Sequence, residues 1–267
     1  MKYQTKKRFG QHFLHDRGVI EKIIAAARLT PEQRVLEIGP GLGVLTDQLL
    51  ERVAEVVVME IDRDLIAGLE QRRNPKLVIH QGDALQNDWV SLLCQPPYTL
   101  VANLPYNISS QVLFRLLDHR QLFSRLVLMF QREVAERLIA SPGSKDYGIL
   151  SVLCQLWFDM DKVTLVKPGA FNPPPRVDSM VLSFVPLATP RVDPVDHVLF
   201  TRLVKGSFTQ RRKTLRNSLL ASGFSGPDID HCLHAAGIDP GCRGETLGLD
   251  QFAALTRSFL QRFHQNG

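Results

Sequence analysis

Short apolar runs alternate with longer amphipathic stretches through the first half of the chain. Five runs of this kind occur, at Arg34–Ile38, Glu55–Met59, Lys76–Ile79, Thr99–Ala102 and Leu126–Phe130. Short apolar runs bounded by polar residues are typical of buried strands, and the stretches between them have the length and spacing of helices. Because strands that alternate with helices usually pair in parallel, we predict an α/β fold with a doubly wound parallel sheet.

The pattern changes after this region. Arg132–Ala140 and Gly148–Phe158 have helical spacing, whereas Val163–Val166 and Val177–Phe184 read as closing strands, for which a hairpin at the sheet edge is one arrangement. Prolines then cluster in Pro186–Pro194, and apolar residues recur at helical spacing beyond them. We therefore predict a first domain over residues 1–188 and a small all-helical domain over 189–267.

Glycine and acidic residues stand at the ends of consecutive predicted strands. Gly39, Gly41 and Gly43 follow the first strand, where they allow a tight turn and close approach of a ligand to the backbone. The spacing differs from G-x-G-x-x-G, and no Lys-Ser/Thr pair follows to form a phosphate loop. By itself, the loop could be an ordinary strand-to-helix turn.

The next two strands end in acids. Glu60, with Asp62 beside it, is placed to accept both hydroxyls of a ribose, and Asp83 is placed to accept an adenine amino group. Either aspartate could instead cap the helix that follows. A nicotinamide cofactor would require provision for phosphate at the loop, and none is evident.

The fourth strand runs into Asn103-Leu104-Pro105-Tyr106. This tetrad places an amide, a proline carbonyl and a phenol ring at one strand end, which suits a planar amino group. Two oxygen acceptors for its hydrogens help to restore a lone pair that is conjugated into a ring. The conservative alternatives are that Asn103 caps the next helix and that Tyr106 bonds within the fold.

Composition restricts the class of protein. The 267 residues are 44% hydrophobic, and no apolar run approaches the roughly 18 residues of a membrane span. The charged start is not followed by an apolar stretch, so we expect no signal peptide and a cytoplasmic location. The four cysteines lack zinc spacing, so we expect reduced, buried thiols and no metal.

Positive charge is concentrated in two places. The net charge is +5, and one cluster includes Arg211, Arg212 and Lys213 while another includes Lys7 and Arg8. Such clusters favour contacts with nucleic acid phosphates, although a solvated helix face is the alternative for the first.

The glycine loop, the two acids and the tetrad resemble the fold of S-adenosylmethionine-dependent methyltransferases, a Rossmann-like sheet. The resemblance implies that Glu60 binds the ribose, Asp83 the adenine, and Gly39 and Gly41 the methionine end of this cofactor. Three longer segments resemble one family more specifically, the bacterial adenine N6,N6-dimethyltransferases of small-subunit (16S) ribosomal RNA. They are Lys7–Leu14, Asn103–Ser109 and Phe171–Ser179, and Gln210–Ser218 is also similar.

This resemblance implies a mechanism and partners. A flipped adenine would stack between Tyr106 and Phe171, with Asn103 and the Pro105 carbonyl accepting from its N6. His12 and Leu14 would border the methionine portion of the cofactor, and His12 stands where family members often carry asparagine. Taken alone, Phe171 before three prolines could simply pack a rigid loop.

The implied reaction is dimethylation of two adjacent adenosines near the 3′ end of 16S rRNA in the immature 30S subunit, coupled to subunit maturation. We expect a monomer that binds neither DNA nor membrane. The alternatives are a 23S rRNA adenine methyltransferase of the macrolide-resistance type, a glutamine-modifying protein methyltransferase, and a non-catalytic ribosome-assembly factor on the same fold. The basic clusters argue against the second, and the intact acids and tetrad argue against the third.

Overall fold

The computed structural model describes residues 11–266, which form two compact units. The first unit comprises the chain up to Ala135 together with Asp159–Pro186, and the second comprises Glu136–Phe158 together with the chain from Leu187 onward. Residues 136–158 therefore group with the C-terminal helices although they precede residue 188. The division of function at residue 188 stays a prediction.

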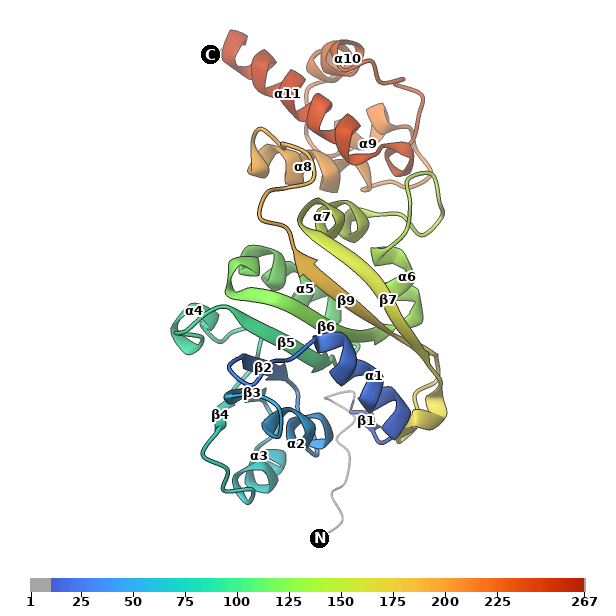
Figure 1. The fold of residues 1–267 in the computed structure, drawn as a ribbon. Coiled ribbons are helices and arrows are strands. Elements are labelled where there is room, and N and C mark those ends of the chain that lie inside the picture. The colour runs from blue at the N-terminus through green and yellow to red at the C-terminus, as the bar shows by residue number, and fades with distance from the viewer. Residues whose placement is uncertain (1–10, 267) are drawn as a thin grey trace. The chain divides into compact units, whose positions relative to one another are not determined.

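The first unit contains a seven-stranded sheet with the order β4-β3-β2-β5-β6-β9-β7 (Figure 1). Strands β2 to β6 pair in parallel, and β9 runs antiparallel to β6. The parallel, doubly wound arrangement is thus confirmed for the five predicted strands, and an antiparallel strand extends it. The strands are β2 (Arg34–Ile38), β3 (Glu55–Glu60), β4 (Leu77–Gln81), β5 (Tyr98–Asn103), β6 (Phe123–Gln131), β7 (Phe158–Val166) and β9 (Ser179–Pro186).

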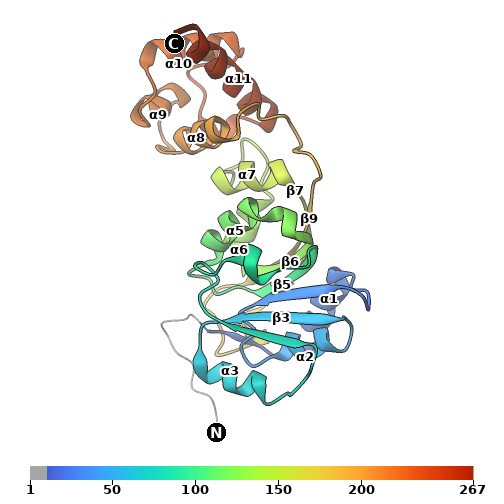
Figure 2. The ribbon, with the colours of Figure 1, turned by 90° about the vertical axis from the view of Figure 1, so that its left-hand side faces the viewer.

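Helices connect these strands, as the amphipathic stretches predicted (Figure 2). Aspartates begin three of them: the side chains of Asp16, Asp62 and Asp88 accept backbone N–H groups at the starts of α1, α3 and α4. The helices are α1 (Arg17–Ala27), α2 (Val44–Leu50), α3 (Arg63–Glu70), α4 (Trp89–Leu92) and α5 (Ser109–Asp118), with short 3₁₀ turns η2 (Arg120–Leu122) and η3 (Pro168–Ala170).

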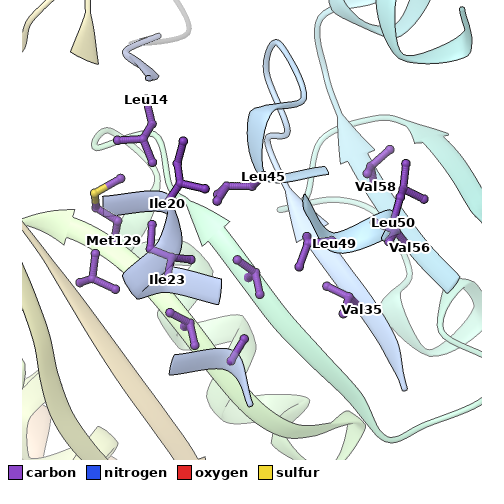
Figure 3. Close-up of a cluster of buried hydrophobic side chains, with 14 of the residues drawn as sticks. Leu14, Ile20, Ile23, Val35, Leu45, Leu49, Leu50, Val56, Val58 and Met129 are labelled. Carbon is purple, nitrogen blue, oxygen red and sulfur yellow. The ribbon is translucent and has the colours of Figure 1, made fainter. Parts of the chain in front are cut away.

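A cluster of buried aliphatic side chains joins α1 and α2 to one face of the sheet (Figure 3). Strand residues contribute to it with a period of two, as in Val56 and Val58 of β3 and in Val127 and Met129 of β6. Intervening residues such as Val57 and Leu128 are buried as well. Burial on both faces explains why these strands read as continuous apolar runs rather than alternating ones.

Strand β7 is longer than the sequence predicted. It begins at Phe158, whereas the apolar pattern identified only Val163–Val166. The missed part carries Asp159, Asp161 and Lys162, and β7 is an outermost strand. Charged residues are common on edge strands, where they oppose pairing with another chain, so hydrophobicity alone cannot detect such a strand.

A second, two-stranded sheet was not predicted at all. Strand β1 (Phe13–Leu14) pairs antiparallel with β8 (Phe171–Asn172), with Leu14 opposite Phe171. The next residue extends the pairing, because the His15 N–H donates to the Ala170 carbonyl over 2.9 Å. This pairing brings the start of the described chain to the segment that precedes β9.

The second unit is helical among its described residues. Its helices are α7 (Ile149–Trp157), α8 (His197–Ser207), α9 (Leu215–Ala221), α10 (Gly226–Ala235) and α11 (Leu249–Asn266), with η4 (Gly244–Thr246). The boundary between the units falls within α6 (Arg132–Leu138), whose residues from Glu136 onward belong to the second unit. Aromatic rings fill its core: Phe252 lies 6.2 Å from Phe200 and 6.3 Å from Phe208 between ring centroids. Tyr147 packs edge-on against Phe208, so it is a core residue of this unit.

The four cysteines are free thiols. Cys154 and Cys232 are buried as predicted, but Cys94 is exposed and Cys242 is only partly buried, so the prediction of buried thiols is wrong for Cys94 and only partly met for Cys242. Within residues 11–266, no helix is long and apolar enough to cross a membrane, and no group of three or more His, Cys, Asp and Glu side chains could hold a metal ion.

Candidate functional site

The carboxyl ends of β2, β3 and β5 meet at one edge of the sheet because these strands pair in parallel. A cavity of about 310 Å³ lies there, within the size range of small-molecule sites, roughly 300–1,000 Å³. Nine of the predicted site residues line it: His12, Leu14, Gly39, Gly41, Glu60, Asp83, Asn103, Pro105 and Tyr106. The structure therefore brings the predicted cofactor and substrate residues of this unit together, with one exception described below.

The glycine loop connects β2 to α2 and lines the cavity. Gly39 and Gly41 have φ values of 67° and 59°, in the left-handed region that glycine adopts without strain. A Cβ atom at Gly41 would also lie 2.9 Å from the Phe13 ring. Both observations require glycine at Gly41, where a side chain would collide with the neighbouring segment.

Glu60 ends β3 with its carboxylate held by the backbone. Its Oε1 accepts from the Asp62 N–H over 2.9 Å, and its Oε2 accepts from the Gly41 N–H over 3.3 Å. Burial raises the pKa of Glu60, and these hydrogen bonds oppose that effect. Each oxygen keeps a second lone pair, so the carboxylate can accept two further hydrogens from a ligand. Asp62 caps α3, as the conservative interpretation had it.

Asp83 follows β4 and presents one oxygen without a partner. Its Oδ1 accepts from the Leu85 N–H over 2.8 Å, whereas its Oδ2 has no hydrogen-bond partner within residues 11–266. The segment around it is fixed from α5: Arg115 donates to the carbonyls of Leu85 and Asn87, the latter over 2.7 Å. The Arg115 guanidinium also lies 5.1 Å from the centre of the Trp89 ring.

The tetrad places its amide with a defined orientation. The Asn103 Nδ2 donates to the His12 carbonyl over 3.0 Å. Because a carbonyl can only accept, the amide oxygen must be the atom turned away from His12. The Pro105 carbonyl accepts from the Ile108 N–H over 3.1 Å, whereas no hydrogen bond to the Leu104 carbonyl occurs in the described part of the chain.

Tyr106 is fixed at its hydroxyl and on its ring. The hydroxyl lies 2.6 Å from Oγ of Ser179, a buried residue at the start of β9. The ring stacks on the His12 imidazole, with a centroid separation of 5.6 Å and an interplanar angle of 29°. Burial raises the pKa of Tyr106, so its hydroxyl stays protonated at neutral pH. Tyr106 does bond within the fold, which is the conservative interpretation, but it also lines the cavity.

Phe171 is the predicted residue that does not line this cavity. Its side chain is only 2% exposed and belongs to the aliphatic cluster against α1. Strand β8 carries it into that cluster through its pairing with Leu14. An open slot between Tyr106 and Phe171 is therefore not formed in this structure, and the packing role considered for Phe171 accounts for its position.

None of the predicted RNA-binding residues that the structure describes lines this cavity. Lys7 and Arg8 lie outside the described residues. Arg211, Arg212 and Lys213 are exposed in the turn that connects α8 to α9 in the second unit. Arg211 donates to the Lys145 carbonyl and lies 3.9 Å from Glu245, so part of its hydrogen-bonding capacity serves this unit.

Glu37 is a site residue that the sequence analysis left without a role. It lies within β2, is 2% exposed, lines the cavity, and its Oε2 accepts from the Thr46 hydroxyl over 2.6 Å. Burial raises the pKa of its carboxyl to about 8. An acid inside an apolar run was the signal that could have identified it. Ser179 and Arg115 gave no such signal, because their partners are remote in sequence.

The profile of the family described as ribosomal RNA adenine dimethylase matches residues 2–258. The ribosomal RNA small subunit methyltransferase A of Syntrophotalea carbinolica is 61% identical over 263 residues, which cover 98% of this chain and 100% of that protein.

Two solved structures are also similar. A dimethyladenosine transferase from Plasmodium falciparum has a TM-score of 0.79 at 30% identity, covering 96% of this chain and 98% of that one. The 23S rRNA methyltransferase ErmE has a TM-score of 0.69 at 27% identity, covering 93% and 100%. These likenesses agree with a Rossmann-like methyltransferase fold.

The buried carboxyl of Glu37 predicts a pH dependence of stability. Its pKa is 4.5 in the absence of structure and about 8 in the fold. Between these values the unfolded chain releases a proton that the folded chain keeps, so a rise in pH favours unfolding. Relative to Glu37→Gln, the wild-type free energy of unfolding should fall by up to about 3 kcal/mol from pH 5.5 to 7.5.

Urea unfolding at these two pH values measures this difference. Glu70→Gln, at an exposed position at the end of α3, is the control and should follow the wild type. Equal pH slopes for the wild type and Glu37→Gln would show that Glu37 is ionised in the folded protein.

Proposed function

The chain belongs to the ribosomal RNA adenine dimethylase family, and from this premise we propose that it dimethylates N6 of two adjacent adenosines near the 3′ end of 16S rRNA. The chain is an rRNA adenine dimethyltransferase, and its methyl donor is S-adenosylmethionine. The choice of small-subunit RNA rests on the 61% identical relative, which is named for the small subunit. We further propose that the immature 30S subunit is the substrate particle and that the chain acts as a cytoplasmic monomer, bound to neither DNA nor membrane.

The residues at the cavity fit this cofactor. Glu60 keeps free lone pairs for the two ribose hydroxyls, and the free Asp83 Oδ2 suits the adenine amino group. Gly39 and Gly41 leave backbone space for the methionine end. When bound, the sulfonium supplies a methyl group that is activated for attack by a weak nucleophile. The roles of His12 and Leu14 beside the methionine portion are part of this proposal.

The observation that carries the proposal is the orientation of the Asn103 amide. Its Nδ2 is committed to the His12 carbonyl, which leaves Oδ1 as a fixed acceptor at the cavity. The Leu104 carbonyl is a second acceptor, which no donor among residues 11–266 occupies, while the Pro105 carbonyl retains one lone pair beside its bond to Ile108. Two fixed acceptors align an exocyclic amino group and disfavour conjugation of its lone pair. Positioning of this kind lowers the barrier without a base or a metal.

The stacking partner of the target adenine is Tyr106 in this proposal. Its ring lines the cavity and is oriented by Ser179 at the hydroxyl. Phe171 would have to leave the aliphatic cluster to form the opposite wall, so its part in stacking requires rearrangement of β8 when RNA binds.

The proposed substrate can be tested directly. Purified unmodified small and large ribosomal subunits are incubated with the protein and S-adenosylmethionine, and methylated adenines are located by mass mapping. We expect two adjacent dimethyladenosines in the small-subunit RNA. Methylation confined to 23S rRNA would contradict the proposal and support the macrolide-resistance type. Cofactor binding without transfer to either RNA would support a non-catalytic assembly factor.

Asn103→Ala should separate cofactor binding from transfer. We expect the single-turnover rate to fall by about 100-fold because the amino group loses a fixed acceptor. The dissociation constant for S-adenosylmethionine, measured by calorimetry, should change little. Asn87→Ala, at a half-buried position that binds Arg115 through its backbone carbonyl, serves as a control. An unchanged rate in Asn103→Ala would remove Asn103 from the mechanism.

Arg115→Met should weaken cofactor binding without affecting the methyl-transfer step. The methionine keeps an aliphatic stem near Trp89 but loses the donors that hold the segment carrying Asp83. Because hydrogen bonds from charged groups contribute about 1.5–3 kcal/mol, we expect the dissociation constant to rise by about 10-fold or more. Arg34→Met, at the amino end of β2 and remote from the cavity, is the control. A fall in the saturated rate with unchanged affinity would contradict this role.

The basic turn between α8 and α9 should contact RNA phosphates, as we propose also for Lys7 and Arg8. The double variant Arg212→Gln and Lys213→Gln avoids Arg211, whose contacts serve the second unit. It should weaken RNA binding and reduce the slope of log affinity against log salt by about 1–2. Lys162→Gln with Arg257→Gln removes the same charge from other exposed positions. Equal salt slopes in both double variants would indicate a merely solvated basic surface.

A further inference from the structure

His12 contacts two segments that are far from it and from each other in the sequence. Its carbonyl accepts from Asn103, its ring stacks on Tyr106, and its Nδ1 lies 2.7 Å from the Pro173 carbonyl. The first two partners belong to the tetrad, and the third belongs to the loop between β8 and β9.

The contact with Pro173 defines the state of the imidazole. A carbonyl oxygen can only accept a hydrogen bond, so Nδ1 of His12 carries the hydrogen. In the neutral ring, Nε2 is then the atom with the lone pair. The ring is therefore held in one plane and one tautomer, against the face of Tyr106.

Little regular structure holds this segment otherwise. Strand β1 has two residues, and its pairing with β8 begins only at Phe13. Leu14 anchors the segment in the aliphatic cluster, but His12 lies before that anchor and lines the cavity. Without the His12 side chain, the segment would lose the contacts that fix it. The His12 carbonyl that orients the Asn103 amide would still be present, but its position would no longer be fixed.

We propose that His12 is a positioning residue for methyl transfer, which fixes the Asn103 amide through its carbonyl and the Tyr106 ring through its imidazole. This inference rests on the proposed adenine dimethylation. It concerns the orientation of the tetrad and is separate from the place proposed for His12 beside the methionine portion, to which Nδ1 cannot donate because it is committed to Pro173. Tyr106 is then held at two points, by Ser179 at its hydroxyl and by His12 on its face.

The effect of His12 should lie on the rate of transfer and not on cofactor affinity. We expect His12→Ala to lower the single-turnover rate at saturating S-adenosylmethionine by about 10- to 100-fold, because small misplacements at the reacting groups are costly. The dissociation constant for S-adenosylmethionine should change by less than about 3-fold, which also shows that the variant is folded. His12→Phe keeps a ring against Tyr106, and His12→Asn keeps a donor for Pro173; each should recover part of the rate. The control is His15→Ala, which alters an exposed side chain in the same segment.

A double-mutant cycle tests the link to the amide. If His12 acts through Asn103, His12→Ala should lower the rate by much less in an Asn103→Ala background than in the wild type. Equal losses in both backgrounds would overturn that link. A rate of His12→Ala equal to that of wild type, or a loss of activity that saturating cofactor restores, would overturn the positioning role.

The tautomer gives a readout on the wild-type protein itself. Nitrogen-15 spectra of the wild-type protein labelled in its histidines should show a hydrogen on Nδ1 of His12, in a signal assigned by its absence in His12→Asn or His12→Phe. An Nε2–H ring would overturn the inference. Failure of the proposed function has a different signature, because wild-type protein would then leave adenines of small-subunit RNA unmethylated before any variant is compared.

Discussion

Parallel pairing of β2 with β3 and with β5 is the constraint on which the site depends. In a parallel sheet all carboxyl ends lie at the same edge, so residues that follow different strands become neighbours. Glu60 ends β3 and Asn103 ends β5, and both line one cavity although they are remote in sequence. The apolar cluster beneath α1 and α2 packs these helices against the strands and so stabilises the sheet whose edge forms the site.

The two halves of the site are built differently. The cofactor half comes from strand ends and the turns directly after them. The substrate half is assembled from distant segments: the tetrad, the start of the chain, and the loop leading into β9 meet through His12, Tyr106 and Ser179. Arg115 on α5 joins the two halves. It lies on the helix that follows the tetrad, and its guanidinium holds the segment of Asp83.

Burial of carboxyl groups at this edge has an electrostatic consequence. Glu37 and Glu60 both have raised pKa values, chiefly because they are desolvated. Backbone N–H donors offset part of the rise in the pKa of Glu60. Glu37 has one hydroxyl donor, and its pKa is the more strongly raised. Groups held in this way cost stability, and such costs are common at functional sites.

The sequence alone determined the alternation of strands and helices, the acids and glycines at the strand ends, and the tetrad. These follow from local rules, because hydrophobic period, glycine conformation and helix capping depend on near neighbours. The family followed from motifs in the right order and is confirmed. Tertiary structure alone decided the pairing of β1 with β8, the edge strand from Phe158, the burial of Phe171, and the contacts of His12. Each of these depends on which remote segment fills a given space, and no local pattern in the chain encodes that choice.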